Sequence, residues 1–266
     1  MSVLDDILSR TRERVERLKA ERPADTLRAD ALYAREPRDF RRAFLKGGLR
    51  VIAEIKFSSP SKGAIYPGES SAAQAARIAS EYLASGAAAL SVLTEPEFFK
   101  GDATFLRRVR QEHPDAPLLM KDFVVDAYQL HLARWAGADA VLLIAAALGR
   151  RLPILLESAQ ALGLAALVEV HDEAEMADAR KAGAALIGVN SRDLMTLKTD
   201  LGVARRLALE GKAAAGSRAV LIAESGITSR AQLEDLAALG YRGFLVGTSL
   251  MATGKPGEAL KELLAG

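Results

Sequence analysis

Short apolar runs rich in β-branched residues alternate with longer alanine-rich segments along most of this sequence. Eight such runs follow one another after residue 50: VIAEIK, AALSVL, PLLMKDF, AVLLIAA, AALVEV, LIGVN, AVLIAES and GFLVGTSL. The segments between them, such as SSAAQAARIASEYLASG, carry apolar residues at helical spacing and often end at glycine, which is typical of amphipathic helices. Strands that alternate with helices form a parallel sheet, and eight strand–helix pairs favour an α/β fold of the closed (β/α)8, or TIM, barrel type.

An open, doubly wound sheet is the competing architecture. The nucleotide-binding form of that fold carries G-x-G-x-x-G after its first strand, whereas here FSSPSKG follows the first strand. Residues 1–45 precede the barrel pattern, and their apolar residues recur near a helical period at Leu4, Ile7 and Val15. We therefore expect residues 1–266 to form a single barrel domain, with residues 1–45 as an N-terminal helical extension packed over one end of the barrel.

Composition excludes several functional classes. The 266-residue chain has a net charge of +2, whereas nucleic-acid-binding proteins usually carry a strongly basic field. It contains no cysteine, which excludes disulfides, thiolate catalysis and cysteine metal ligands. The charged N-terminus lacks the pattern of a signal peptide, and no apolar run reaches the roughly 20 residues that span a bilayer. We expect a cytoplasmic protein without nucleic-acid or membrane partners, acting as a monomer, with a homodimer as the alternative.

Polar side chains interrupt the inward-facing side of several predicted strands near their carboxyl ends. Because side chains alternate between the two faces of a strand, Glu54 and Lys56 share a face with Ile52. Barrel interiors prefer branched apolar residues, and burying charge is costly unless it is paired. Glu54 and Lys56 alone are equally well explained as a structural ion pair, but the full set predicts an active site at this mouth. Its inward polar residues are Glu54, Lys56, Lys121, Glu169, Asn190 and Glu224.

Small residues follow the last two predicted strands. Gly226 stands in AESGI and Gly247 in VGTSLM, with Ser225 and Thr248 beside them. Small residues let backbone N–H groups approach an anion, and barrel enzymes often bind phosphate at these two loops. Each loop alone is equally well explained as an ordinary turn, but the pair predicts a phosphate site.

The remaining titratable residues give weaker signals. We expect His113 and His131 on the surface of helices, and His171 in a loop bordering the site. No metal-ligand spacing such as H-x-x-x-H and no Walker loop is present, so neither a metal nor a cofactor is expected. Three aspartates are best explained as local ion-pair or capping residues: Asp122, Asp126 and Asp193.

The strand ends carry the motifs of a known family. IAEIKFSSPSKG resembles the signature of the indole-3-glycerol phosphate synthase family, an E-x-K pair followed by S-P-S. The likeness continues through LTEPEFFKG, LLMKDFVVD, LVEVHD, IGVNSRDL, IAESGI and LVGTSLM, and it includes the N-terminal helical extension. The resemblance implies an enzyme of tryptophan biosynthesis, a carbon–carbon carboxy-lyase that acts on a phosphorylated small molecule without a cofactor.

The reaction implied by this resemblance is a decarboxylating ring closure. It converts 1-(2-carboxyphenylamino)-1-deoxyribulose 5-phosphate to indole-3-glycerol phosphate, carbon dioxide and water, and each step needs a proton donor or acceptor. In the family's pattern Lys121 is the general acid for ring closure and Glu169 is the general base for the dehydration. Lys56 holds anionic groups of the substrate, and its use as the second acid stays open. Glu54 orients the lysines, and Asn190 contacts the ribulose hydroxyls or the leaving hydroxyl.

The resemblance also implies the substrate contacts. Phosphate would be bound by Gly226, Gly247 and Thr248, and an aromatic ring would pack against Phe99 and Phe123, because a planar apolar group needs an apolar slot. The loop after the first strand would close over the anionic substrate. The full set of substrate-binding residues is Ser59, Phe99, Phe123, Arg192, Glu224 and Ser225.

Two other functions compete with this one. Phosphoribosylanthranilate isomerase and the tryptophan synthase α chain are related barrels, but they need a different acid–base set, often with cysteine or aspartate. A non-catalytic phosphate-binding barrel would be indicated by loss of Lys121 or Glu169, and both are present. The two lysines would lower each other's pKa while the glutamates oppose that shift, so the sequence leaves the net direction open.

Overall fold

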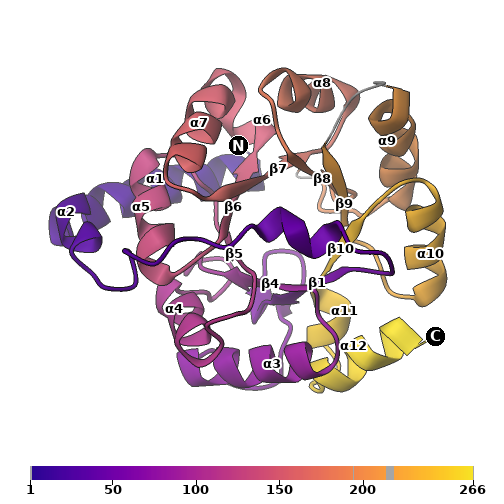
Figure 1. The fold of residues 1–266 in the computed structure, drawn as a ribbon, viewed down its shortest axis with the longest axis horizontal. Coiled ribbons are helices and arrows are strands. Elements are labelled where there is room, and N and C mark those ends of the chain that lie inside the picture. Colours follow the sequence, from indigo (N-terminus) through magenta and orange to yellow (C-terminus); the bar gives the residue numbers. More distant parts are fainter. Residues whose placement is uncertain (1, 194, 214–218, 266) are drawn as a thin grey trace.

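Eight parallel strands close into a barrel, as the sequence predicts (Figure 1). The computed structural model describes residues 2–193, 195–213 and 219–265. Around the barrel the strands follow the order β1-β10-β9-β8-β7-β6-β5-β4, and β1 pairs with both β10 and β4 to close the ring. The barrel strands are β1 (Val51–Ile55), β4 (Ala89–Leu93), β5 (Leu118–Lys121), β6 (Ala140–Ile144), β7 (Ala165–Val170), β8 (Leu186–Asn190), β9 (Val220–Glu224) and β10 (Gly243–Val246).

Helices follow the barrel strands and surround the sheet (Figure 1). Several begin at a side-chain cap that accepts a hydrogen bond from a backbone N–H of the first turn, including Ser71, Asp102 and Asp126. The prediction that Asp126 is a capping residue is confirmed. No helix among the described residues is long and apolar enough to cross a membrane. The surrounding helices are α3 (Ala72–Ala84), α4 (Ala103–Glu112), α5 (Ala127–Ala136), α6 (Ala145–Leu148), the 3-10 helix η2 (Gly149–Arg151), α7 (Leu152–Ala161), α8 (Glu173–Lys181), α9 (Leu201–Ala213), α10 (Arg230–Ala238), α11 (Thr248–Met251) and α12 (Pro256–Ala265).

The predicted alternation of side chains along the strands is confirmed. In β1, Val51 and Ile55 point outward and pack into the core between the sheet and the helices. Ile52 points inward and packs with Leu119 and Leu167 in a separate core inside the barrel. Because every second residue of a strand faces inward, the polar residues two positions beyond this apolar layer also face inward, at the carboxyl-terminal mouth.

The N-terminal extension contacts both ends of the barrel, whereas the sequence led us to expect only one. Its 3-10 helix η1 (Phe40–Phe44) is the dark segment that crosses the near opening in Figure 1, and the rings of Phe40 and Phe44 are fully buried in the inner core. Helix α1 (Val3–Glu21) and the short α2 (Ala24–Arg28) pack against α5, and α1 begins at the opposite mouth. That the whole chain forms a single domain stays a prediction.

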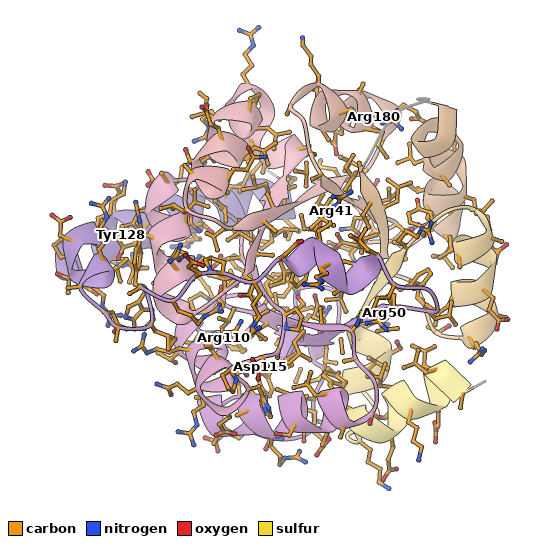
Figure 2. The ribbon with its side chains drawn as sticks, viewed as in Figure 1. Arg41, Arg50, Arg110, Asp115, Tyr128 and Arg180 are labelled. Atoms are coloured by element: carbon orange, nitrogen blue, oxygen red, sulfur yellow. The ribbon has the colours of Figure 1, made fainter. Side chains whose placement is uncertain are left out.

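A buried ion cluster holds the segment between α2 and η1 against the barrel. Asp139, just before β6, is fully buried and accepts hydrogen bonds from Arg35 and Arg110, each at 2.5 Å. It also accepts from the backbone N–H groups of Arg38 at 2.8 Å and Leu118 at 2.9 Å. Figure 2 shows Arg110 beneath this segment. A buried carboxylate is tolerated when it is paired and fully hydrogen-bonded, and this one joins the extension to two barrel strands.

Candidate active site

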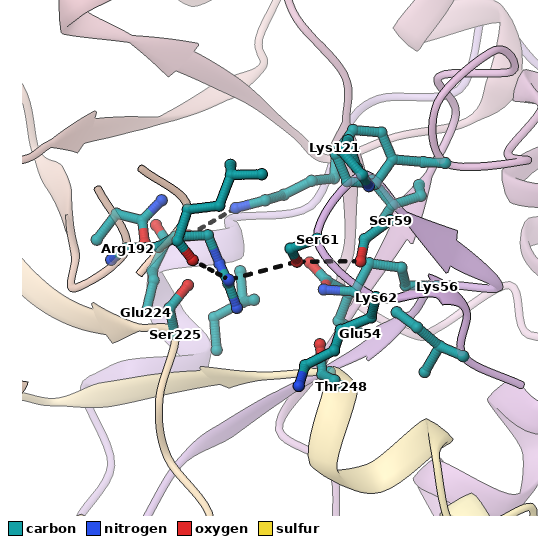
Figure 3. A pocket seen from close by; sticks show the side chains of 18 of the residues that line it. Glu54, Lys56, Ser59, Ser61, Lys62, Lys121, Arg192, Glu224, Ser225 and Thr248 are labelled. Atoms are coloured by element: carbon teal, nitrogen blue, oxygen red, sulfur yellow. Dashed lines mark hydrogen bonds and ion pairs between the residues drawn. The ribbon is translucent and has the colours of Figure 1, made fainter. Parts of the chain in front are cut away.

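A cavity of about 560 Å³ opens at the carboxyl-terminal mouth of the barrel. Figure 3 shows Arg192, Glu224 and Ser225 on one side of it and Lys56 and Ser59 on the other. Every residue that the sequence predicted for the site lines this cavity, so their predicted convergence is confirmed, although their roles stay predictions. These residues are Glu54, Lys56, Ser59, Phe99, Lys121, Phe123, Glu169, Asn190, Arg192, Glu224, Ser225, Gly226, Gly247 and Thr248.

Lys121, the last residue of β5, is held between two carboxylates from other strands. Its Nζ lies 2.6 Å from Glu224 Oε2 and 3.2 Å from Glu169 Oε2. Asn190 at the end of β8 donates a hydrogen bond from Nδ2 to Glu169 Oε1 at 3.0 Å. Four strands therefore place an ammonium, two carboxylates and an amide within one network that can donate and accept protons.

Glu54 and Lys56 form a second pair on the opposite side of the mouth. Lys56 Nζ lies 2.6 Å from Glu54 Oε1. A Cβ atom at position 247 would overlap the Glu54 carboxylate. Gly247 therefore makes room for Glu54, which is a second reason for a glycine there besides the approach of an anion.

The two loops predicted to bind phosphate lie together at the mouth. Ser249 Oγ donates to the carbonyl oxygen of Ile227 at 3.0 Å, which ties the loop after β9 to the loop after β10. Gly247 precedes the short helix α11, which begins at Thr248. Gly226 has a φ of 81°, a left-handed conformation that favours glycine. This arrangement matches the location at which barrel enzymes commonly bind phosphate.

Comparison with known proteins decides the family. A family model described as indole-3-glycerol phosphate synthase matches residues 4–263. The chain belongs to the indole-3-glycerol phosphate synthase family. A curated indole-3-glycerol phosphate synthase from Endomicrobium trichonymphae is 40% identical, with 98% of this chain and 99% of that protein covered. Another, from Salinibacter ruber, is 43% identical, with 100% and 96% covered.

The solved structures agree on the fold. Thiamine phosphate pyrophosphorylase from Pyrococcus furiosus has a TM-score of 0.58 and 19% sequence identity, with 81% of this chain and 93% of that chain covered. A likeness at this identity supports the barrel fold alone. The family predicted from the motifs is thus confirmed by sequence relatives, and the predicted fold by structural ones.

In this member of the indole-3-glycerol phosphate synthase family, the carboxylates set the protonation of Lys121. Burial lowers the pKa of Lys121, but the nearby Glu224, Glu169 and Glu54 outweigh burial and raise the pKa above its ordinary value. The sequence left this direction open, because the effect of Glu224 depends on a contact between strands. Lys121 is therefore a fully charged ammonium in the free site.

The two carboxylates that hold Lys121 differ from each other. Burial raises the pKa of Glu169, but Lys121, His171 and Asn190 outweigh burial and lower that pKa below its ordinary value. Burial, opposed by Lys121 but assisted by Glu169 and Glu54, raises the pKa of Glu224 to about 7. Glu169 is therefore ionised and able to accept a proton, whereas Glu224 exchanges its proton near neutral pH. Such a division of pKa values is typical of paired acid–base groups.

The loop after β1 forms a small hairpin. Strands β2 (Ser58–Ser59) and β3 (Gly63–Ala64) pair in antiparallel fashion. At the tip of the hairpin, Ser61 Oγ lies 3.4 Å from a guanidinium nitrogen of Arg192, across the mouth (Figure 3). Arg192 is fixed in turn by donating to the carbonyl oxygen of Leu197 at 2.8 Å. Closure of the hairpin over a substrate stays a prediction.

His171 was expected in a loop bordering the site, and it also lies beside the carboxylate of Glu169. Its Nε2 lies 3.4 Å from Glu169 Oε1, and its Nδ1 lies 3.0 Å from Glu175 Oε2. Burial lowers the pKa of His171, but its bonds to Glu169 and Glu175 outweigh burial and raise the pKa to about 10. The imidazolium therefore places a positive charge beside Glu169.

The other two histidines are partly exposed, in keeping with their predicted surface location, and each also contacts a neighbouring element. His113 Nε2 lies 2.9 Å from Ser80 Oγ, and His131 Nδ1 lies 2.7 Å from the hydroxyl of Tyr33. Neither lines the cavity. Helical spacing placed them on helices, but it could not show which neighbouring element covers them.

Two of the predicted local aspartates behave differently from each other. Asp193 accepts hydrogen bonds from the backbone N–H groups of Met195 and Thr196, so its local role is confirmed. Asp122 forms an ion pair as predicted, but its partner is the distant Arg14 of α1.

Sequence reasoning missed the part of the cavity that α1 supplies. Val3, Leu4 and Ile7 line the cavity beside the residues from the barrel strands. The helical period of Leu4 and Ile7 showed that these residues would be buried. Only the docking of α1 at this mouth shows what they face.

Proposed function

We propose that this protein converts 1-(2-carboxyphenylamino)-1-deoxyribulose 5-phosphate to indole-3-glycerol phosphate, carbon dioxide and water, a step of tryptophan biosynthesis. The observation that carries the proposal is the Lys121 ammonium, held 2.6 Å from Glu224 and 3.2 Å from Glu169 in a chain of this family. A phosphorylated small molecule fits both the family and the loops at the mouth of the barrel.

Ring closure needs a proton donor beside the substrate carbonyl, and we assign that role to Lys121. Its raised pKa keeps the proton in place until negative charge develops on the carbonyl oxygen. Stabilisation that grows as the charge develops is what lowers a barrier. After the dehydration step is complete, Glu224, with a pKa of about 7 and only 2.6 Å away, supplies the proton that restores Lys121.

The later loss of water needs a base for the proton that is removed and an acid for the departing hydroxyl, and we assign these roles to Glu169 and Lys56. In the free site the positive charge of Lys121 keeps the pKa of Glu169 low, which makes Glu169 a weak base. Once Lys121 has given its proton away, that charge is gone and Glu169 accepts a proton more readily. Donation by Lys121 therefore prepares Glu169 for the next step. Asn190, 3.0 Å from Glu169, keeps its carboxylate oriented.

The substrate's other groups have matching partners around the cavity. Phe99 and Phe123, with ring centroids 5.9 Å apart, form an apolar wall for the aromatic ring. Lys56 and Arg192 provide positive charge for its carboxylate. The loops at Gly226 and Thr248 bind the phosphate, and no cofactor or metal is needed.

Turnover by the wild type and by a Lys121→Ala variant tests the proposal. The purified protein is incubated with the substrate, and the indole product is followed by fluorescence. Lys121→Ala should lower kcat by about 100- to 10,000-fold, as expected for loss of a general acid, while substrate binding remains measurable. Lys181→Ala, a change on the exposed side of α8, is the control and should behave like the wild type. Near-normal turnover by Lys121→Ala would show that another group is the acid.

The remaining predictions concern the oligomeric state, the cellular location and the partners of the protein. We propose a monomer in the cytoplasm without nucleic-acid partners, with a homodimer as the alternative. A non-catalytic phosphate-binding barrel is a poorer explanation, because such a protein would not need Lys121 and Glu169 to be paired inside the mouth.

A further inference from the structure

Helix α1 presents an arginine to the active-site end of the barrel that the mechanism above does not use. Leu4, Ile7, Thr11 and Arg14 recur along one side of α1, and the first two line the cavity. Arg14 is mostly buried, with 14% of its side chain exposed, and it contacts two carboxylates from different barrel loops. An arginine fork can hold two acceptors at once in a fixed geometry.

The first carboxylate is Asp122, which directly follows the catalytic Lys121. Arg14 Nη2 donates to Asp122 Oδ1 at 2.6 Å. The same Asp122 oxygen accepts from the backbone N–H of Phe123 at 2.8 Å, and the other oxygen accepts from Thr94 Oγ1 at 2.8 Å. Asp122 therefore fixes the backbone at Phe123 and connects it to the neighbouring loop after β4.

The second carboxylate is Glu95, in that loop after β4. Arg14 Nη1 lies 3.6 Å from Glu95 Oε1. Glu95 Oε2 accepts from the backbone N–H groups of Phe98 at 2.7 Å and Phe99 at 3.0 Å. The backbone at Phe99 is thus fixed by Glu95 in the same way that the backbone at Phe123 is fixed by Asp122.

These contacts close a ring around the base of the aromatic wall. Asp122 and Glu95, each only 3% exposed, are two buried negative groups, and Arg14 is the cation that contacts both. Each carboxylate accepts a hydrogen bond from the backbone N–H of one of the two phenylalanines, Phe99 and Phe123, whose ring centroids lie 5.9 Å apart. Without the cation, the buried carboxylates would repel each other, and the loops that carry the rings would move apart.

We propose that Arg14 is a positioning residue that sets the spacing of Phe99 and Phe123 and so determines how well the site accepts the aromatic part of its ligands. The inference rests on the proposed function, because it takes the ring-bearing substrate as given. Arg14 acts through Asp122 and Glu95, and it is absent from the residues that line the cavity. The N-terminal extension thereby contributes to specificity as well as to stability.

The test compares a ligand that has the aromatic ring with one that lacks it. Indole-3-glycerol phosphate and glycerol 3-phosphate share a phosphorylated glycerol, but only the first carries the ring. Their dissociation constants are measured by calorimetry with the wild type, Arg14→Gln and Arg14→Lys, together with kcat, KM and the melting temperature. Lys19→Gln is the matched control, because Lys19 also joins α1 to the loop after β5, 2.8 Å from Asp126, but its ion pairs are with Asp126 and Glu16 and not with Asp122 or Glu95.

We expect Arg14→Gln to raise the dissociation constant of indole-3-glycerol phosphate by about tenfold and to raise KM by a similar factor. The dissociation constant of glycerol 3-phosphate should stay at its wild-type value. Arg14→Lys, which keeps the charge but not the fork, should restore part of the loss. If Arg14→Gln does not fold, Arg14→Lys decides, because it should still weaken the ring-bearing ligand selectively.

Three results would overturn the inference. The first is that the Arg14 variants bind both ligands as tightly as the wild type does. The second is that the Arg14 variants lose affinity for both ligands equally. The third is that Lys19→Gln causes the same selective loss of affinity for the ring-bearing ligand. Failure of the proposed function looks different, because the wild type itself would then neither turn over the substrate nor bind indole-3-glycerol phosphate.

Discussion

Replacing Gly188 with alanine should move Glu224 away from Lys121. Gly188 lies in the middle of β8, between β7 and β9, and it faces the inside of the barrel. A Cβ atom there would overlap Glu224 Oε1 and lie 3.3 Å from Leu167 Cδ1. Glu224 Oε1 is buried without a hydrogen-bond partner among the described residues, so no hydrogen bond resists the displacement of this oxygen.

The size of the effect follows from the overlap. Nonbonded carbon and oxygen atoms approach to about 3 Å, so the carboxylate must shift by about 1 Å or more. Its other oxygen lies 2.6 Å from Lys121 Nζ, and a shift of that size breaks this contact. Misplacement of a catalytic group by about 1 Å can lower activity about 100-fold. Gly188→Ala should therefore reduce kcat/KM by about 100-fold and lower the free energy of unfolding by about 1 to 3 kcal/mol.

The assay is steady-state turnover together with urea unfolding, and Gly243→Ala is the control. A Cβ atom at position 243 would crowd Ile222 and Phe44 at the opposite end of the barrel, 2.5 Å and 2.7 Å from their nearest atoms. That variant should lose stability similarly but keep its activity. If Gly188→Ala retained wild-type kcat/KM, or if both variants lost activity equally, the reasoning about Glu224 would be refuted.

Two further predictions concern the histidine beside the base and the buried ion cluster. The pKa of His171 is raised to about 10, so the residue is positively charged at neutral pH and lowers the pKa of Glu169. His171→Gln should raise the pKa of Glu169 and move the lower acid limb of the kcat/KM profile, measured between about pH 3 and 6, to higher pH; an unchanged limb would contradict this. Asp139→Asn should lower the free energy of unfolding by about 3 to 5 kcal/mol, because Arg110 would be left as a buried, poorly compensated charge. A loss below about 1 kcal/mol in urea unfolding would show that other groups compensate.

The sequence predicted the barrel and the polar residues at the ends of its strands, because both depend on short-range periodicity. A period of two along β1 places Ile52 inside the barrel, and the same period carries Glu54 to the mouth. When eight strands are parallel, residues at their carboxyl ends must meet. The inward polar residues could therefore be listed before any distance was known, whereas loop residues such as Phe99 and Arg192 were implied only by the resemblance to the family.

Contacts between elements distant in the chain could not be predicted in this way. The partner of Asp122 is Arg14, 108 positions away, and the period of α1 says only which of its sides is buried. The direction of the Lys121 pKa likewise depends on Glu224 lying 2.6 Å away on another strand. Docking geometry and burial decide both, and neither has a local pattern in the sequence.

The most direct test of the account is a single incubation of the wild-type protein with 1-(2-carboxyphenylamino)-1-deoxyribulose 5-phosphate. The account predicts that indole-3-glycerol phosphate, measured by its fluorescence, and carbon dioxide appear in equal amounts without any added metal or cofactor. Binding of the substrate without either product would contradict the account.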